Sequence, residues 1–180
     1  MANWLNDRLK AYGIETRLCD LGMQAEGLPL PPAILGRIGN ESDKKTVLIY
    51  GHFDVQPVCF SSRSLISSSL SSQALLSDGW ETEPFTLTVK PNGQMLGRGS
   101  SDDKGPILGW LNVLQYYHDN HKELPVNIRF CFEGMEESGS EGLDQLVQTE
   151  SRPGGWFSGV DCACIVRLSR EPFSTSRFFL

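Results

Sequence analysis

Apolar residues along this chain follow the periods of both strands and helices. Residues 46–50 form a short run of β-branched and apolar side chains that predicts a buried strand, and residues 126–132 alternate apolar and polar side chains. Between these two segments, apolar residues recur every three or four positions from Ile107 to Tyr117, which predicts an amphipathic helix. Pro106 suits the first turn of that helix, where an N–H is not needed.

The whole pattern predicts an α/β domain. Gly13 is expected to end the first helix. The apolar face of this helix is expected to comprise Trp4, Leu5, Leu9 and Tyr12. The predicted order is helix 2–12, strands 14–19, 33–38 and 45–51, a hairpin of strands 85–90 and 94–98 turned by Pro91-Asn92-Gly93, helix 106–120, strand 126–132, helix 140–149 and strand 160–166.

Three clusters of acidic or imidazole side chains stand where predicted strands end or the long helix begins. In Gly51-His52-Phe53-Asp54, strand alternation would direct His52 and Asp54 to the same side, as suits a metal-bound histidine with a carboxylate partner. The pair at 102–103 precedes the helix, and the glutamates at 136–137 follow strand 126–132. Neighbouring glutamates on an extended segment diverge, so that one can bind metal while the other handles protons.

Each cluster also has an ordinary explanation. A His-x-Asp sequence is common in polar turns, aspartates cap helices, and paired glutamates occur in solvated acidic turns. In open α/β sheets, however, ligand-binding groups usually converge at the carboxyl ends of strands. Three such clusters together therefore favour a metal site.

Four motifs resemble the dinuclear metallopeptidase family that includes cytosolic nonspecific dipeptidase and carnosinase. They are Gly-His-Phe-Asp-Val-Gln-Pro at 51–57, Asp-Gly-Trp-Glu-Thr-Glu-Pro-Phe at 78–85, Gly-Arg-Gly-Ser-Ser-Asp-Asp-Lys-Gly-Pro at 97–106 and Glu-Gly-Met-Glu-Glu-Ser-Gly-Ser-Glu-Gly at 133–142. The resemblance implies a mixed sheet flanked by helices, in a partial zinc-peptidase-like catalytic domain without the family's lid domain. It also implies two divalent metal ions, zinc or manganese, as cofactors.

The same resemblance implies a role for each residue of the clusters. His52 looks like a ligand to one metal, Asp102 like the carboxylate that bridges two metals, and Glu137 like a ligand to the second. Asp54 is similar to the carboxylate that steadies the histidine, and Glu136 to the general base. Imidazole nitrogen and carboxylate oxygen are ligands that zinc and manganese accept.

The chain departs from the family at its end and in an insert. Where the family has a further aspartate ligand, this chain has Arg167, and residues 166–180 do not match. A guanidinium would repel a dication. Within the 180 residues we therefore find three of the five family ligands, and His118 and His121 are not expected to replace the others. The insert at 58–77 has nine serines between positions 61 and 77, so we expect a mobile loop. We interpret residues 1–180 as one partial catalytic domain carrying this insert and tail.

Net charge and cysteine content indicate which partners and which cell compartment are expected. The net charge of −6 argues against nucleic acid or an anionic membrane as a partner. The N-terminus lacks the basic start and apolar centre of a signal peptide, and the five cysteines contain no Cys-x-x-Cys pair, so we expect a cytoplasmic protein with free thiols.

The functional hypothesis is metal-dependent hydrolysis of dipeptides, with a small peptide as substrate. The resemblance implies a homodimer for the family, but the family's lid domain is absent here. Because ligands and lid are missing, we expect this chain to bind metal weakly and to hydrolyse dipeptides poorly or not at all. Two alternatives remain. One is a non-catalytic splice product or mis-predicted gene model. The other is a related amide hydrolase such as an aminoacylase or a glutamate carboxypeptidase.

Overall fold

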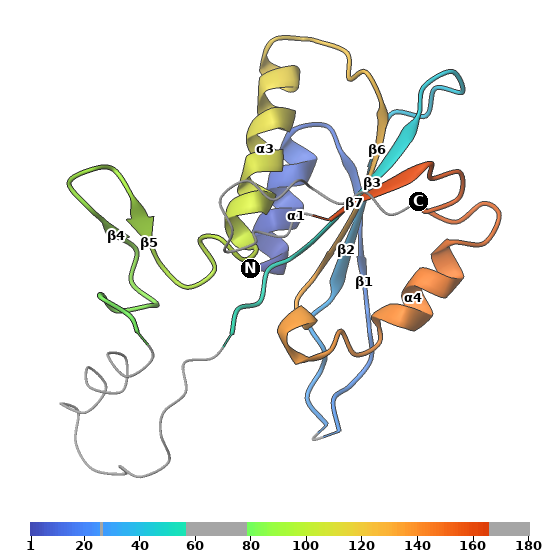
Figure 1. Cartoon of the computed structure of the whole chain (residues 1–180). Coiled ribbons are helices and arrows are strands. Elements are labelled where there is room, and N and C mark those ends of the chain that lie inside the picture. Colours follow the sequence, from blue (N-terminus) through green and yellow to red (C-terminus); the bar gives the residue numbers. More distant parts are fainter. Residues whose placement is uncertain (26, 57–78, 166–180) are drawn as a thin grey trace.

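A mixed five-stranded sheet forms the centre of the computed structural model, which describes residues 1–25, 27–56 and 79–165. The strand order is β1-β2-β6-β3-β7, with β1 antiparallel to β2, β2 antiparallel to β6, and β3 parallel to both β6 and β7 (Figure 1). The strands are β1 Glu15–Cys19, β2 Ala33–Ile38, β3 Thr46–His52, β6 Asn127–Glu133 and β7 Cys162–Ile165. The expected mixed sheet flanked by helices is confirmed.

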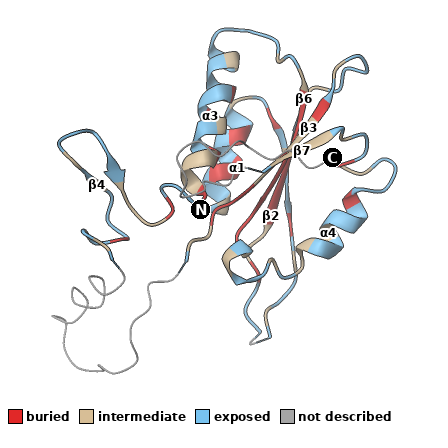
Figure 2. Ribbon diagram, in the orientation of Figure 1, coloured by how far each residue is buried: buried red, intermediate tan, exposed pale blue. Residues whose placement is uncertain are grey.

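Helices cover both faces of this sheet. Helices α1 (Ala2–Ala11) and α3 (Lys104–Asp119) lie together on one face, and α4 (Leu143–Glu150) lies on the other (Figure 1). Buried residues are concentrated in the strands and on the helix sides that face them (Figure 2). The resulting three layers bury apolar surface on each side of the sheet, which is the main favourable contribution to folding.

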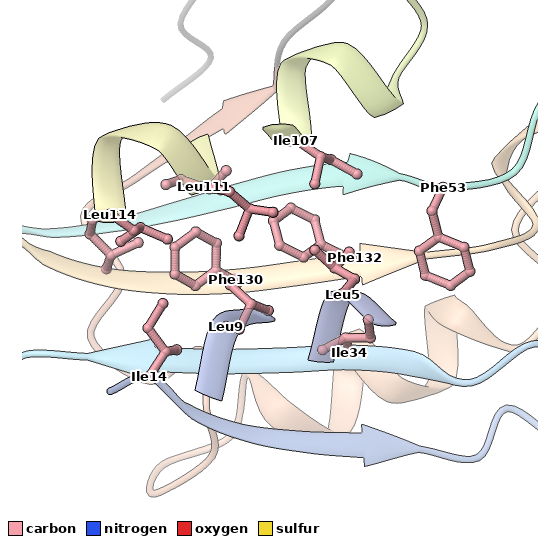
Figure 3. Packing of buried hydrophobic residues seen from close by; sticks show 12 residues of the cluster. Leu5, Leu9, Ile14, Ile34, Phe53, Ile107, Leu111, Leu114, Phe130 and Phe132 are labelled. Carbon is pink, nitrogen blue, oxygen red and sulfur yellow. The ribbon is translucent and has the colours of Figure 1, made fainter. Parts of the chain in front are cut away.

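The larger core lies between the sheet and helices α1 and α3. Figure 3 shows side chains of α3 and α1 packed around the phenyl rings of β6. The buried members of this cluster are Leu5, Leu9, Ile14, Ile34, Ile49, Phe53, Ile107, Leu111, Leu114, Ile128, Phe130 and Phe132. The predicted stripe on the long helix therefore faces the sheet, as its period requires.

Helix α1 follows the prediction except at one residue. Leu5 and Leu9 are fully buried, whereas Trp4 is 42% exposed and has the Arg8 guanidinium 5.5 Å from its ring centre. Gly13 ends the helix as expected: its φ of +76° is in the left-handed region, and the N–H of Ile14 bonds to the carbonyl of Leu9 at 3.2 Å. Trp4 lies at the edge of the apolar stripe, where the sheet does not cover it.

The hairpin is shorter than predicted. Its strands are β4 (Thr88–Val89) and β5 (Met95–Leu96), with Gly93 at φ +83° in the turn. Phe85 and Leu87 remain about three-fifths exposed, at 58% and 62%. A two-stranded ribbon without a packed face is only marginally stable, which explains why the pairing covers two residues on each strand instead of five or six.

Other boundaries move by a few residues. Strand β3 extends to His52, a 3-10 turn (η1, Glu136–Ser138) occupies the loop after β6, and α4 begins at Leu143 instead of residue 140. The predicted insert 58–77, Arg167 and the tail 166–180 lie outside the described residues. Among the helices of the described ranges, none has the length and hydropathy needed to cross a membrane.

Candidate metal centre

Parallel pairing brings two of the predicted clusters to the same edge of the sheet. His52 and Glu133 are register partners at the carboxyl ends of β3 and β6. The loop that follows β6 turns back through η1, which carries Glu136 and Glu137, and the residues before α3 bring Asp102 to the same place. Clusters that are 50 and 85 residues from His52 in sequence therefore meet around its imidazole.

His52 is the buried centre of the cluster. Its side chain is 6% exposed; Nε2 lies 3.0 Å from Oδ1 of Asp102 and 3.7 Å from Oε2 of Glu136. Nδ1 lies 3.2 Å from Oδ1 of Asp54. The side chains of Asp102 and Glu136 are 72% and 43% exposed, so the imidazole is buried below a rim of carboxylates that solvent can reach.

The ligand atoms of His52, Asp102 and Glu137 fit a divalent cation. They lie within 4.8 Å of one another. Zinc bonds to nitrogen and oxygen are about 2.0–2.2 Å long, so ligand atoms around one ion lie within roughly 4.4 Å of each other. Because the Asp102 and Glu137 side chains are not fully buried, a small rotation would close the difference. The structure thus brings together all three predicted ligands.

Asp54 connects the imidazole to the glutamate loop. Its Oδ1 faces Nδ1 of His52, and its Oδ2 accepts a hydrogen bond from the backbone N–H of Glu137 at 3.0 Å. Gln56 donates to Oε2 of Glu137 at 2.5 Å. One carboxylate therefore holds the histidine and the loop at a fixed separation, which is more than the sequence indicated.

Asp103 is a residue of the site that sequence reasoning treated only as a capping alternative. It occupies the N-cap position of α3, but its side chain makes no capping hydrogen bond. Its Oδ2 instead accepts the backbone N–H of His52 at 3.0 Å, and its Oδ1 is buried without a partner among the described residues. A methyl group at Gly51 would stand 2.6 Å from the same Oδ2, so only glycine leaves room for this contact.

The concentration of carboxylates shifts the titration of the site. Burial lowers the pKa of His52, but its hydrogen bond with Asp102 and the charges of Glu136, Asp103 and Asp54 outweigh burial, and the pKa is raised. For Glu136, burial is the largest cause of a raised pKa. The charges of Glu137 and Asp102 raise this pKa further, and the charge of His52 lowers it. A divalent cation among these groups would offset their mutual repulsion.

The remaining histidines lie elsewhere. His118 is in the last turn of α3 and pairs with Asp119 at 3.1 Å, and His121 follows the helix. With 16 residues, α3 is about 24 Å long, and the candidate site is at its other end. As expected from the sequence, neither histidine joins the site.

Comparisons with known proteins give a consistent result. Residues 48–175 match the family model described as peptidase family M20/M25/M40. Over 168 residues the chain is 44% identical to the Cys-Gly metallodipeptidase dug1 of Schizosaccharomyces pombe, a match that covers 92% of this chain and 32% of that protein. The chain thus spans about a third of the length of the curated relatives it matches.

Solved structures agree with the sequence matches. The dipeptidase Dug1p of Saccharomyces cerevisiae superposes with a TM-score of 0.74 and 44% identity, over 91% of this chain and 32% of that chain. Human carnosine dipeptidase 1 superposes with a TM-score of 0.75 and 40% identity, over 92% and 32% respectively. The mixed sheet and its helices are therefore shared with these two dipeptidases.

Proposed function

The chain belongs to peptidase family M20/M25/M40, and on that premise we propose that its candidate metal centre takes part in the metal-dependent hydrolysis of dipeptides. The observation that carries the proposal is the convergence of His52, Asp102 and Glu137 at the carboxyl ends of β3 and β6, with their ligand atoms within 4.8 Å of each other. The names of the relatives, Cys-Gly dipeptidase and β-Ala-His dipeptidase, support a small dipeptide as the substrate.

The proposed cofactor is a pair of divalent ions, zinc or manganese, which Asp102 would help to hold together with His52 and Glu137. Bound there, such ions would supply Lewis acidity that polarises a peptide carbonyl and lowers the pKa of a coordinated water. His52 would contribute Nε2, because donation of Nδ1–H to Asp54 leaves the Nε2 lone pair free for a ligand bond. Glu137 would contribute a carboxylate oxygen, and its backbone N–H is held by Asp54.

Glu136 is proposed as the general base. It lies beside the ligand cluster, with Oε2 3.7 Å from Nε2 of His52, and is partly exposed. Its raised pKa, caused first by burial and then by neighbouring carboxylates, makes it a better proton acceptor than an ordinary glutamate. From this position it could take a proton from water and pass it to the leaving amine.

We propose that residues 1–180 form one part of a catalytic domain, and that this 180-residue polypeptide on its own hydrolyses dipeptides slowly. Three converging candidate ligands in the described residues are fewer than two metal ions require to be held tightly. Metal binding is therefore the first property to measure, and hydrolysis the second.

The test is metal content after dialysis against zinc or manganese, followed by hydrolysis of Cys-Gly and β-Ala-His. We expect the purified chain to bind a divalent ion weakly, and His52→Ala to reduce its affinity at least about tenfold through loss of a buried ligand. His118→Ala is the matched control and should leave the affinity unchanged. Equal metal content in the two variants would contradict the proposal.

A further inference from the structure

Glu133 is a buried carboxylate at the end of β6 that the proposed chemistry does not use. It is 0% exposed, and its Oε1 accepts hydrogen bonds from the hydroxyl groups of Tyr50 at 2.6 Å and Ser140 at 2.7 Å. Its backbone carbonyl accepts the N–H of Phe53 at 2.8 Å. Among the described residues, Oε2 has no hydrogen-bond partner.

These contacts join the two elements that supply the candidate ligands. Tyr50 lies on β3, two residues before His52. Ser140 closes the loop that carries Glu136 and Glu137, and its backbone N–H bonds to the carbonyl of Met135 at 2.8 Å. The Glu133 carboxylate thus links the strand of the histidine with both ends of the glutamate loop.

The arrangement is costly for a simple turn. Burying a carboxylate without a countercharge is unfavourable even when it accepts hydrogen bonds. Ser140 has a φ of +54°, in the left-handed region that a non-glycine residue rarely adopts. Such features persist where the position of a loop matters.

We propose that Glu133, Tyr50 and Ser140 form a positioning clamp that fixes the Glu136–Glu137 loop relative to His52. This inference rests on the proposed function, because the clamp sets the distance between two candidate metal ligands, His52 and Glu137. The hydroxyl groups donate to a carboxylate below the site, so all three are positioning residues.

Amide hydrogen exchange tests the clamp without any metal. Tyr50→Phe and Ser140→Ala each delete one hydroxyl group and nearly preserve shape. Tyr117→Phe and Ser138→Ala are matched controls, since neither hydroxyl bonds to a described residue in the structure. In the presence of a chelator, we expect the Glu137 amide to exchange about tenfold faster in the clamp variants, because a hydrogen bond to the buried Glu133 carboxyl group is lost. Amides in the middle of β6 should be unaffected.

A second measurement connects the clamp to the ligands. Ser140→Ala should weaken binding of zinc about tenfold, but should have no effect when Glu137→Gln is already present, since the clamp acts through that side chain. A variant that merely destabilises the domain would weaken binding in both backgrounds.

The outcomes separate the two proposals. If the unaltered chain binds no divalent ion, the proposed function fails, and the exchange rates still decide the clamp. If it binds zinc and the clamp variants match their controls in both exchange and affinity, the clamp is wrong while the function stands. If the Glu137 amide exchanges faster in the clamp variants than in their controls, the clamp is supported.

Discussion

Asp102 and Asp103 are neighbours in the chain with opposite surroundings. The side chain of Asp102 is 72% exposed and faces the imidazole of His52, whereas Asp103 is 2% exposed and bonds to the backbone of the same residue. Capping of α3 explains neither, because Asp103 makes no capping bond. One aspartate is therefore available to solvent and metal, and the other supports the strand end below.

The burial of Asp103 predicts a pH dependence of stability. Burial raises its pKa from 3.8 to about 6, so between these values the folded chain binds more protons than the unfolded chain. The free energy of unfolding should then fall as pH rises from about 4 to 7, by at most about 3 kcal/mol from this group. Urea unfolding, measured in the presence of a chelator, should show this fall in the free energy of unfolding with pH in the original chain and a smaller fall in Asp103→Asn. Identical slopes would mean that the carboxyl group is not desolvated as described.

At the scale of elements, α3 connects the core to the site. Its first residues follow Asp102 and Asp103, and its apolar side packs on β6 (Figure 3). Leu111 is 6% exposed, and Leu108, three residues earlier, is 42% exposed. The two leucines differ in burial but share a helix, which makes them a matched pair.

Truncation of these leucines should separate packing from helix propensity. Leu111→Ala removes buried side-chain atoms and should lower the free energy of unfolding by about 2–5 kcal/mol. Leu108→Ala should change it by less than about 0.5 kcal/mol, since a leucine-to-alanine change at an exposed helix position is nearly neutral. Chemical denaturation monitored by circular dichroism measures both. Similar losses would indicate that α3 does not dock through the Leu111 side.

Long elements were predictable from the sequence, and local contacts were not. The strands around Ile49 and Phe130 and the helix around Leu111 have strong periodicity, so their positions agree within one or two residues. The hairpin was predicted too long because a turn signal at Asn92-Gly93 says nothing about missing partners for Phe85 and Leu87. An apolar period in the sequence predicts which side of an element is buried, but that side becomes buried only if another element packs against it.

Recognition of the site depended on motifs more than on spacing. His52, Asp102 and Glu137 were each ambiguous alone, and they meet because β3 and β6 are parallel, which pattern alone did not establish. Glu133 and Tyr50 were missed because a charged residue at a strand end ordinarily marks exposure, whereas here two hydroxyl groups allow its burial. The available signal was a glutamate directly after the apolar run ending in Phe132.

At the scale of the whole molecule, the site unites distant parts of the chain. Its candidate ligands, at positions 52, 102 and 137, converge only in the folded state. An ion that binds them therefore stabilises the folded chain by mass action. This links the chemistry of a few side chains to the thermal stability of the domain.

Addition and removal of metal should shift the thermal transition. At a free ion concentration of 100 times Kd, we expect a gain of about 2.7 kcal/mol, or roughly 5–10 °C in Tm, reversed by chelator. His52→Ala, which is expected to bind at least about tenfold more weakly, should lose about half of this gain or more at the same ion concentration, and His118→Ala should keep it. Differential scanning calorimetry with zinc and with manganese measures the shift; a shift of the same size in His52→Ala would place the ion elsewhere.

Strand β6 lies between β2 and β3 in the sheet, although both precede it in the chain by many residues. During synthesis, β1 and β2 can pair at once, but the inner edge of β2 and the edge of β3 stay open until residue 133 has left the ribosome. Strands that are far apart in sequence pair slowly, and their unpaired edges can aggregate until they pair. The nascent chain should consequently need chaperone protection until β6 arrives, and translation pauses between positions 53 and 126 should increase its aggregation.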